Sequence, residues 1–375
     1  MSRRTRLRFR IDDSGVLEVV DPGWDCLELM KSIDPCFQVR SQPIKGFTIP
    51  RFIRARKTGC GHSPAEIREM PSQQLWLVHD NALNFLKNGI EKPPTNDETT
   101  LLHLKIELSR RILKKCTLCA HRCGVDRTSG ELGVCELGTE AKVAEHFVHI
   151  GEETLVNPSH VMNLAGCGLR CLYCQQGYLL DPAGVDGEPL DKSLWDQMDL
   201  HGARSLSFAG GNPDESTFSV LCFLLSAPEN WSLPVVWNCH GFSSPETLRL
   251  LDGVVDVWLP DYKYGNHLCG QQLSGVNHYP NVAQKSVKAM LAQNVPVIVR
   301  ILVLPGHSQC CHLPVLETLA KMANPEKLMV SVRGQYCPDW RILSCDNNMN
   351  RRIMEKEVME IIEKAKAMGL TLATT

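Results

Sequence analysis

Residues 161–178 read VMNLAGCGLRCLYCQQGY, a short apolar run followed at once by three cysteines in C-x-x-x-C-x-x-C spacing. The apolar run is typical of a buried strand, so Cys167, Cys171 and Cys174 would lie in the loop after it. A closed zinc site or a four-iron cluster held by thiolates alone takes four ligands. No other cysteine lies within forty residues downstream. The spacing therefore indicates a metal site whose fourth ligand comes from elsewhere.

From this strand onward, short apolar runs alternate with amphipathic segments. We expect six strands, at 161–165, 204–210, 234–238, 254–260, 295–305 and 327–332. We expect helices at 214–227, 245–251, 281–293, 312–323 and 350–368. Such alternation predicts an α/β fold with a parallel sheet. Six units are too few for a closed eight-stranded barrel, which leaves an incomplete barrel or a doubly wound sheet.

Polar and glycine residues follow four of the expected strands. The three cysteines follow the first strand and GGNP (210–213) follows the second. Asn238 closes the third, and Asp261 and Lys263 follow the fourth. Ligands bind at the carboxyl ends of the strands in both α/β architectures. We therefore expect these residues to converge on one site.

The composition is that of an ordinary globular protein, with 43% apolar and 22% charged residues among 375. The formal charge of -2 provides no global field that would recruit nucleic acid or an acidic membrane. No signal peptide is recognisable, and no apolar run approaches the roughly 20 residues of a membrane span. We expect a reducing cytoplasmic setting, where clustered cysteines are metal ligands more often than disulfides.

A second cysteine cluster precedes the α/β segment. The stretch CTLCAHRCGVDRTSGELGVC has C-x-x-C-x-x-x-C spacing and a further cysteine twelve residues later, and its members are Cys116, Cys119, Cys123 and Cys135. Four thiolates suit a closed site, either a structural zinc or a second iron-sulfur cluster, in which His121 could replace one cysteine. Basic residues lie nearby, but no aromatic residues are interleaved with them, which disfavours nucleic-acid binding.

The remaining sequence is less informative. Residues 1–98 show weak periodicity and predict only an N-terminal extension of unknown role. A helix is expected at 100–114, within a segment of residues 99–155 that contains the four-cysteine module; residues 156–375 would form the α/β domain. The ten cysteines outside the two clusters, Cys310 and Cys311 among them, are expected to be packing residues or inert thiols.

The three-cysteine loop resembles the signature of the radical S-adenosylmethionine (SAM) enzymes, in which an aromatic residue precedes the third cysteine, as Tyr173 does here. The resemblance implies that Cys167, Cys171 and Cys174 hold three irons of a 4Fe-4S cluster, with SAM on the fourth iron. It implies reductive cleavage of SAM to a 5′-deoxyadenosyl radical, which abstracts hydrogen from a substrate. An incomplete (β/α)6 barrel is the implied fold, and a flavodoxin or ferredoxin is the implied electron donor.

Two further motifs extend the resemblance to a SAM pocket. GGNP looks like the superfamily's glycine-rich motif, which implies SAM contacts for Gly210, Gly211 and Asn212. WNCHG, with Asn238, stands where the activating enzymes of glycyl-radical enzymes carry an aspartate.

Charged residues at two later strand ends fit the same pattern. LPDYKY looks like the D-x-K motif of those activating enzymes, which implies that Asp261 and Lys263 lie near the SAM carboxylate. VRILVLPG looks like their arginine-bearing strand, which implies a bidentate pair between Arg300 and that carboxylate.

The resemblance is closest to the PflX-like relatives of the pyruvate formate-lyase activating enzyme, which share the four-cysteine module, and it covers about residues 113–370. The sequence departs from their M-x-Q-Y-x-P pattern at GQYCP (334–338). The implied substrate is a glycyl-radical enzyme, another protein or peptide, or a small molecule. The alternatives from other classes are an iron-sulfur electron carrier and a zinc-stapled binding protein.

Overall fold

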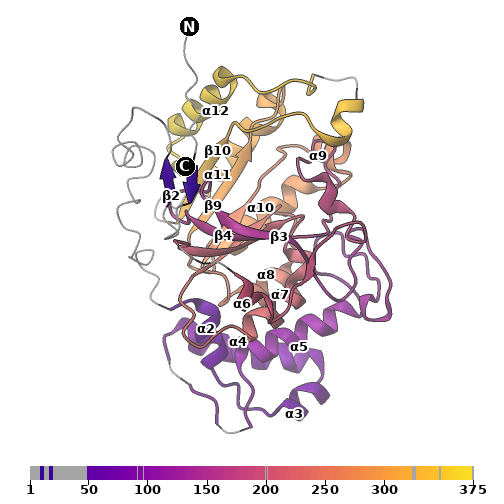
Figure 1. Cartoon of the computed structure of the whole chain (residues 1–375), viewed down its shortest axis with the longest axis vertical. Helices are drawn as coiled ribbons and strands as arrows, with labels where there is room; N and C mark the ends of the chain where they lie inside the picture. Colours follow the sequence, from indigo (N-terminus) through magenta and orange to yellow (C-terminus); the bar gives the residue numbers. More distant parts are fainter. Residues whose placement is uncertain are drawn as a thin grey trace.

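The structure is a computed structural model, and it describes residues 9–11, 17–19 and 49–373, except 91, 96, 199, 201, 323–326, 346 and 347. A large sheet occupies the middle of the molecule, and helices α2 to α5 gather at its lower end in Figure 1. The described N-terminal residues form a two-stranded antiparallel sheet of β1 (Phe9–Ile11) and β2 (Leu17–Val19). No helix in the described part of the chain has the length and apolar character needed to cross a membrane.

The large sheet has eight strands in the order β10-β9-β8-β7-β6-β4-β3-β5. They are β3 (Lys142–His149), β4 (Ser159–Leu164), β5 (Glu188–Pro189), β6 (Ser205–Gly210), β7 (Val235–Cys239), β8 (Val257–Pro260), β9 (Val297–Leu302) and β10 (Leu328–Arg333). Neighbours from β4 to β10 are parallel, whereas β3 is antiparallel to both β4 and β5. The predicted α/β fold with a parallel sheet is confirmed.

The six expected strands correspond to β4 and β6 to β10, which lie side by side in sequence order. A doubly wound sheet reverses its strand order at a switch point, and these six strands show no reversal. Every residue of β4 and of β8 is buried. This is expected of parallel strands that are covered on both faces.

Helices cover the sheet between successive strands. They are α6 (Leu194–Gln197), α7 (Thr217–Leu225), α8 (Pro245–Leu251), α9 (His267–Ser274), α10 (Tyr279–Leu291), α11 (Leu313–Ala320) and α12 (Glu355–Ala367). Four short 3-10 segments are η2 (Arg127–Ser129), η3 (Gly177–Leu180), η4 (Asp214–Ser216) and η6 (Trp340–Ser344), and η5 (Ser308–His312) is a π-helix. The five helices predicted after residue 156 match α7, α8, α10, α11 and α12, whereas α9 was not predicted.

Residues 51–113 form four helices, namely α2 (Arg51–Lys57), α3 (Pro64–Glu69), α4 (Ser72–Lys87) and α5 (Leu101–Leu113). Helix α5 is the one predicted at 100–114; it packs against α2, α3 and α4 on one side and against α7 and α8 of the sheet layer on the other. Phe52, Leu75 and Leu102 belong to the same buried core as Trp237 and Trp258 of the sheet. The weak periodicity of this region therefore concealed a helical layer that shares the central core.

Lys105 is fully buried in this helical layer. Its Nζ lies 2.8 Å from His79 Nε2 on α4 and donates to the carbonyl of Asp252 after α8 at 2.7 Å. Burial lowers the pKa of Lys105 to about 7 and that of His79 to about 3. Near neutral pH, an uncharged histidine therefore accepts from a lysine that is close to deprotonation, and the bond links α4, α5 and the end of α8.

Candidate active site

A cavity of about 360 Å³ opens at the carboxyl ends of the parallel strands. Every residue that the resemblance assigned to the three-cysteine site or the SAM pocket lines it: Cys167, Cys171, Tyr173, Cys174, Gly210, Gly211, Asn212, Asn238, Asp261, Lys263 and Arg300. The parallel register accounts for this, because Leu164 of β4 pairs with Gly210 of β6 and Asp261 pairs with Arg300. The predicted convergence on one site is present in the fold.

The three-cysteine loop leaves β4 and forms one wall of the cavity. Cys167 and Cys171 are buried and Cys174 is half-buried. Burial raises the pKa of the Cys174 thiol to about 11 and also raises that of Cys167. Such thiols stay protonated at neutral pH unless a bound cation compensates the charge of the thiolate. A single metal ion requires ligand atoms that lie close together. Among the described residues, the sulfurs of these three cysteines do not form a group in which all ligand atoms lie within 4.8 Å of one another.

Hydroxyl groups connect the middle cysteine to α9. Cys171 Sγ lies 2.9 Å from Ser274 Oγ at the end of α9. Ser274 Oγ in turn lies 2.5 Å from Tyr264 Oη, and Tyr264 Oη lies 2.8 Å from Tyr173 Oη. The hydroxyl of Tyr173, the aromatic residue before the third cysteine, is therefore held by Tyr264. These buried hydrogen bonds connect the cysteine loop to α9.

The glycine pair after β6 packs against the entrance of the same loop. Gly211 N donates to Leu164 O at 2.8 Å, and Asn212 N donates to Gly166 O at 3.0 Å. A Cβ atom on Gly211 would lie 2.1 Å from Gly166 O. Gly210 has a φ of +95°, a left-handed value that glycine adopts without strain. Both glycines are thus required by the backbone that carries Cys167.

A buried network that the sequence analysis missed lies beneath the cysteine loop. Glu215 Oε1 accepts from Gly168 N at 2.9 Å and lies 3.2 Å from His240 Nε2, while its Oε2 accepts from the Asn212 amide. Burial opposes the ionisation of Glu215, but His240 and these hydrogen bonds keep its pKa below the usual value. Glu215 therefore holds the loop between the first and second cysteines. Its position two residues after GGNP was the available signal.

Ion pairs of the residues that follow β8 and of β9 also line the cavity. Lys263 Nζ lies 2.5 Å from Asp261 Oδ2. Burial opposes its charge, but Asp261 and the nearby Cys171 raise the pKa of Lys263 above its usual value. Lys263 therefore stays protonated, and the two charged residues of the D-x-K motif pair with each other.

Arg300 has two carboxylate partners that the sequence analysis did not predict. Its Nε and Nη2 donate to the two oxygens of Glu153 at 2.8 and 2.6 Å, and Nη2 also contacts Glu152. Burial opposes ionisation of Glu152, yet Arg300 lowers its pKa to about 2. Nη1 makes no hydrogen bond to the described residues, so it is the donor that is left for a ligand. A bidentate pair with a ligand through Nε and Nη2 would have to replace Glu153.

The four-cysteine module lies next to this site. Cys116, Cys119 and Cys135 are buried and Cys123 is exposed. A Cβ atom on Gly168 would lie 3.5 Å from Cys119 Sγ, so the module abuts the three-cysteine loop. The sequence analysis named His121 as a residue that could replace one cysteine ligand. Its Nε2 lies 2.7 Å from Gly168 O and therefore contacts the three-cysteine loop. Among the described residues, no three ligand atoms of this module group within 4.8 Å, and its metal remains a prediction.

The chain is 32% identical over 321 residues to the uncharacterized protein MJ0674 of Methanocaldococcus jannaschii. The aligned region covers 82% of this chain and 91% of MJ0674. No family model matches the sequence. Among solved structures, SuiB of Streptococcus suis superposes with a TM-score of 0.38 at 14% identity over 57% of this chain and 47% of SuiB. SuiB bound to S-adenosylmethionine gives a TM-score of 0.38 at 13% identity over 56% of this chain and 48% of SuiB. SuiB bound to the precursor peptide SuiA gives a TM-score of 0.39 at 14% identity over 56% of this chain and 46% of SuiB. Scores this low do not establish a shared fold.

Proposed function

We propose that this chain, which belongs to the same family as MJ0674 of Methanocaldococcus jannaschii, is a radical SAM enzyme. The observation that carries the proposal is the convergence of all eleven residues of the expected cluster and SAM site on one cavity. They come from the ends of five strands, so their shared location is not a consequence of nearness in sequence. An incomplete (β/α)6 barrel, built from β4 and β6 to β10, is the architecture we propose for this domain.

The residues present fit a 4Fe-4S cluster. Cys167, Cys171 and Cys174 offer three thiols on one cavity wall. A cluster bound there would supply one electron for the cleavage of SAM into methionine and a 5′-deoxyadenosyl radical, which abstracts hydrogen from the substrate. The loop would supply three ligands to such a cluster, which leaves one iron for SAM; Cys239, which also lines the cavity, belongs to β7.

The remaining cavity residues would bind and orient SAM. The main chain at Gly210, Gly211 and Asn212, which lines the cavity, would bind its amino group. Lys263 and Nη1 of Arg300 would attract its carboxylate, and Asp261 would hold Lys263 in place. Asn238 contributes an uncharged side chain at the end of β7.

We propose division of the chain into the N-terminal extension (1–98), the segment with the four-cysteine module (99–155) and the radical SAM domain (156–375). The module would hold a zinc ion or a second iron-sulfur cluster. The proposed substrate is a glycyl-radical enzyme, another protein or peptide, or a small molecule, and a flavodoxin or ferredoxin would donate the electron.

The experiment is metal analysis and SAM binding on anaerobically purified and reconstituted protein. Wild type should contain iron and sulfide at the 167–174 site and should bind SAM. Cys171→Ala should lose both, whereas Cys345→Ala, which alters a half-buried thiol outside the clusters, should keep both. Zinc alone, with no iron taken up on reconstitution, would exclude the enzyme and favour a zinc-stapled binding protein. Iron without SAM binding would favour an electron carrier.

A further inference from the structure

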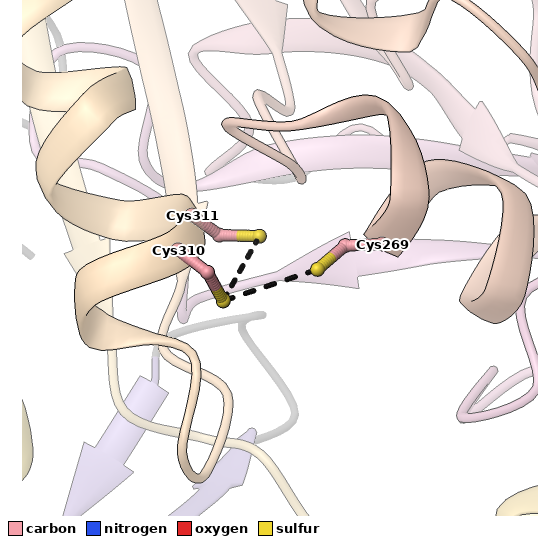
Figure 2. A group of neighbouring side chains, drawn as sticks. All are labelled: Cys269, Cys310 and Cys311. Atoms are coloured by element: carbon pink, nitrogen blue, oxygen red, sulfur yellow. Dashed lines mark hydrogen bonds between the residues drawn. The ribbon is translucent and has the colours of Figure 1, made fainter.

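Three cysteines outside the cavity form a compact group. The Sγ atoms of Cys269, Cys310 and Cys311 lie within 4.8 Å of one another, and no other three described histidine, cysteine, aspartate or glutamate ligand atoms do so. In Figure 2, the three side chains point into the space between two helical segments. These segments are the first turn of α9, with Cys269, and the π-helix η5, with the vicinal pair. The sequence analysis expected Cys310 and Cys311 to be packing residues or inert thiols and did not predict this grouping with Cys269; Cys311 is buried in the core.

The distances between the sulfurs match a metal site. Cys310 Sγ lies 3.9 Å from Cys269 Sγ and 3.9 Å from Cys311 Sγ. Thiolates held tetrahedrally at about 2.3 Å from one Zn²⁺ ion are about 3.8 Å apart. A disulfide would bring two of the sulfurs to about 2.05 Å. The observed spacing thus matches the edge of a zinc-thiolate tetrahedron and is far longer than a disulfide bond.

Asn266 provides hydrogen-bond donors to this group. Its Nδ2 lies 3.1 Å from Cys269 Sγ and 3.6 Å from Cys311 Sγ, and it donates to Cys310 O at 2.8 Å. Its Oδ1 accepts from Cys269 N at 2.8 Å and caps α9. N–H groups directed at sulfur stabilise bound thiolates and orient them, as second-shell partners do at metal sites. One side chain therefore contacts all three cysteines.

Access differs among the three ligands. Cys311 is fully buried and Cys269 is 9% exposed, whereas Cys310 is exposed. An ion can therefore enter from solvent on the side of Cys310, and three protein ligands leave one tetrahedral position open.

The group also joins segments that support the candidate active site. The opposite end of α9 carries Ser274, whose Oγ lies 2.9 Å from Cys171 Sγ. A Cβ atom on Gly265, two residues after Lys263, would lie 2.5 Å from Cys311 O. An ion bound by the three cysteines would thus fix α9 and the loop after β8 against η5.

We propose that Cys269, Cys310 and Cys311 bind one Zn²⁺ ion, which fastens α9 to η5 and leaves a fourth position for water. The site does not depend on the proposed enzymatic function, because it lies outside the cavity and uses other cysteines. It binds the metal as three thiolates with release of their protons, and it requires no oxidant or reductant.

The test compares the zinc content of three full-length proteins, wild type, Cys310→Ser and Cys345→Ser, purified anaerobically, treated with a chelator and re-exposed to Zn²⁺. Cys310→Ser should bind about one equivalent less than the other two, and any zinc in the four-cysteine module is common to all three. Equal zinc content in all three proteins would overturn the proposal. So would a disulfide among the three cysteines in peptide mapping of the anaerobic protein.

A second measurement uses wild type alone and so avoids any effect of a variant on folding. Iodoacetamide should alkylate the exposed Cys310 slowly in the presence of Zn²⁺ and at least tenfold faster after EDTA is added, while the rate at Cys345 stays constant. An unchanged rate at Cys310 would also overturn the proposal.

Discussion

At the scale of single residues, Arg300 forms an ion pair with a residue distant in sequence, which its motif did not predict. The strand motif implied a bidentate pair between Arg300 and the SAM carboxylate, but Glu153, 147 positions earlier, occupies Nε and Nη2. Glu153 is fully buried, so the pair also matters for stability. Sequence patterns indicate which residues end a strand, yet they do not indicate which loop lies across from them.

Arg300→Ala should weaken SAM binding about 10- to 100-fold, because one charge-assisted hydrogen bond contributes roughly 1.5–3 kcal/mol. The same change should destabilise the fold by about 3 kcal/mol, since it leaves buried carboxylates without their cation. Calorimetric SAM titration and thermal unfolding of the reconstituted protein measure the two effects, with cluster absorbance retained. Arg249→Ala, which breaks a half-exposed pair with Asp80, is the matched control. Unchanged SAM affinity in Arg300→Ala would remove Arg300 from the site.

Gly211→Ala should displace the cysteine loop, because the added Cβ would lie 2.1 Å from Gly166 O, next to Cys167. We expect reconstituted iron to fall by more than half and the melting temperature to fall by several degrees. Gly138→Ala is the control, since its added Cβ would have no neighbour within 4 Å. If the two variants retain the same iron as wild type, the glycine pair does not position the loop.

At the scale of elements, the sequence predicted most of the α/β segment. Continuous apolar runs marked β4 and β6 to β10, and Ser244 before Pro245 marked the start of α8, where Thr247 N donates to Ser244 Oγ at 3.1 Å. The elements that were missed lack a clear apolar pattern. Only Val143 of strand β3 is buried, and α9 contains few apolar residues although Asn266 and Gly275 cap its two ends.

The candidate site could also be predicted only in part. Residues that end parallel strands could be placed together from the sequence, because register aligns the strand ends. The supporting partners Glu215, Glu152 and Glu153 could not be assigned, and neither could the zinc group, since Cys269 and Cys310 are 41 positions apart. Those contacts depend on how loops pack, which periodicity does not encode.

The helical layer provides a pH-dependent prediction at Lys105. Its pKa is about 7 when folded and about 10.4 when unfolded, so between these values the unfolded state binds more protons and stability rises with pH. Below pH 7 the full cost of burying the charge is present. Wild type should therefore gain roughly 3–4 kcal/mol relative to Lys105→Met between pH 7 and 10. Urea unfolding of both proteins under anaerobic conditions measures it, and a constant difference across that interval would contradict the burial argument.

At the scale of the whole molecule, three cysteine groups surround the carboxyl ends of one parallel sheet. The four-cysteine module abuts the loop of Cys167, and α9 connects that loop to the group at Cys269. The helices at 51–113 share the core with the sheet and lie at one end of it (Figure 1). The four-cysteine module and α9 therefore both contact the loop of Cys167, at Gly168 and at Cys171.

The most direct test is the production of 5′-deoxyadenosine by reconstituted protein mixed with SAM and a strong reductant, quantified by mass spectrometry. We predict that wild type forms it and that Cys171→Ala does not, because only the intact loop can hold a cluster with an open iron. A wild-type protein that retains its cluster and binds SAM but forms no 5′-deoxyadenosine would contradict the account.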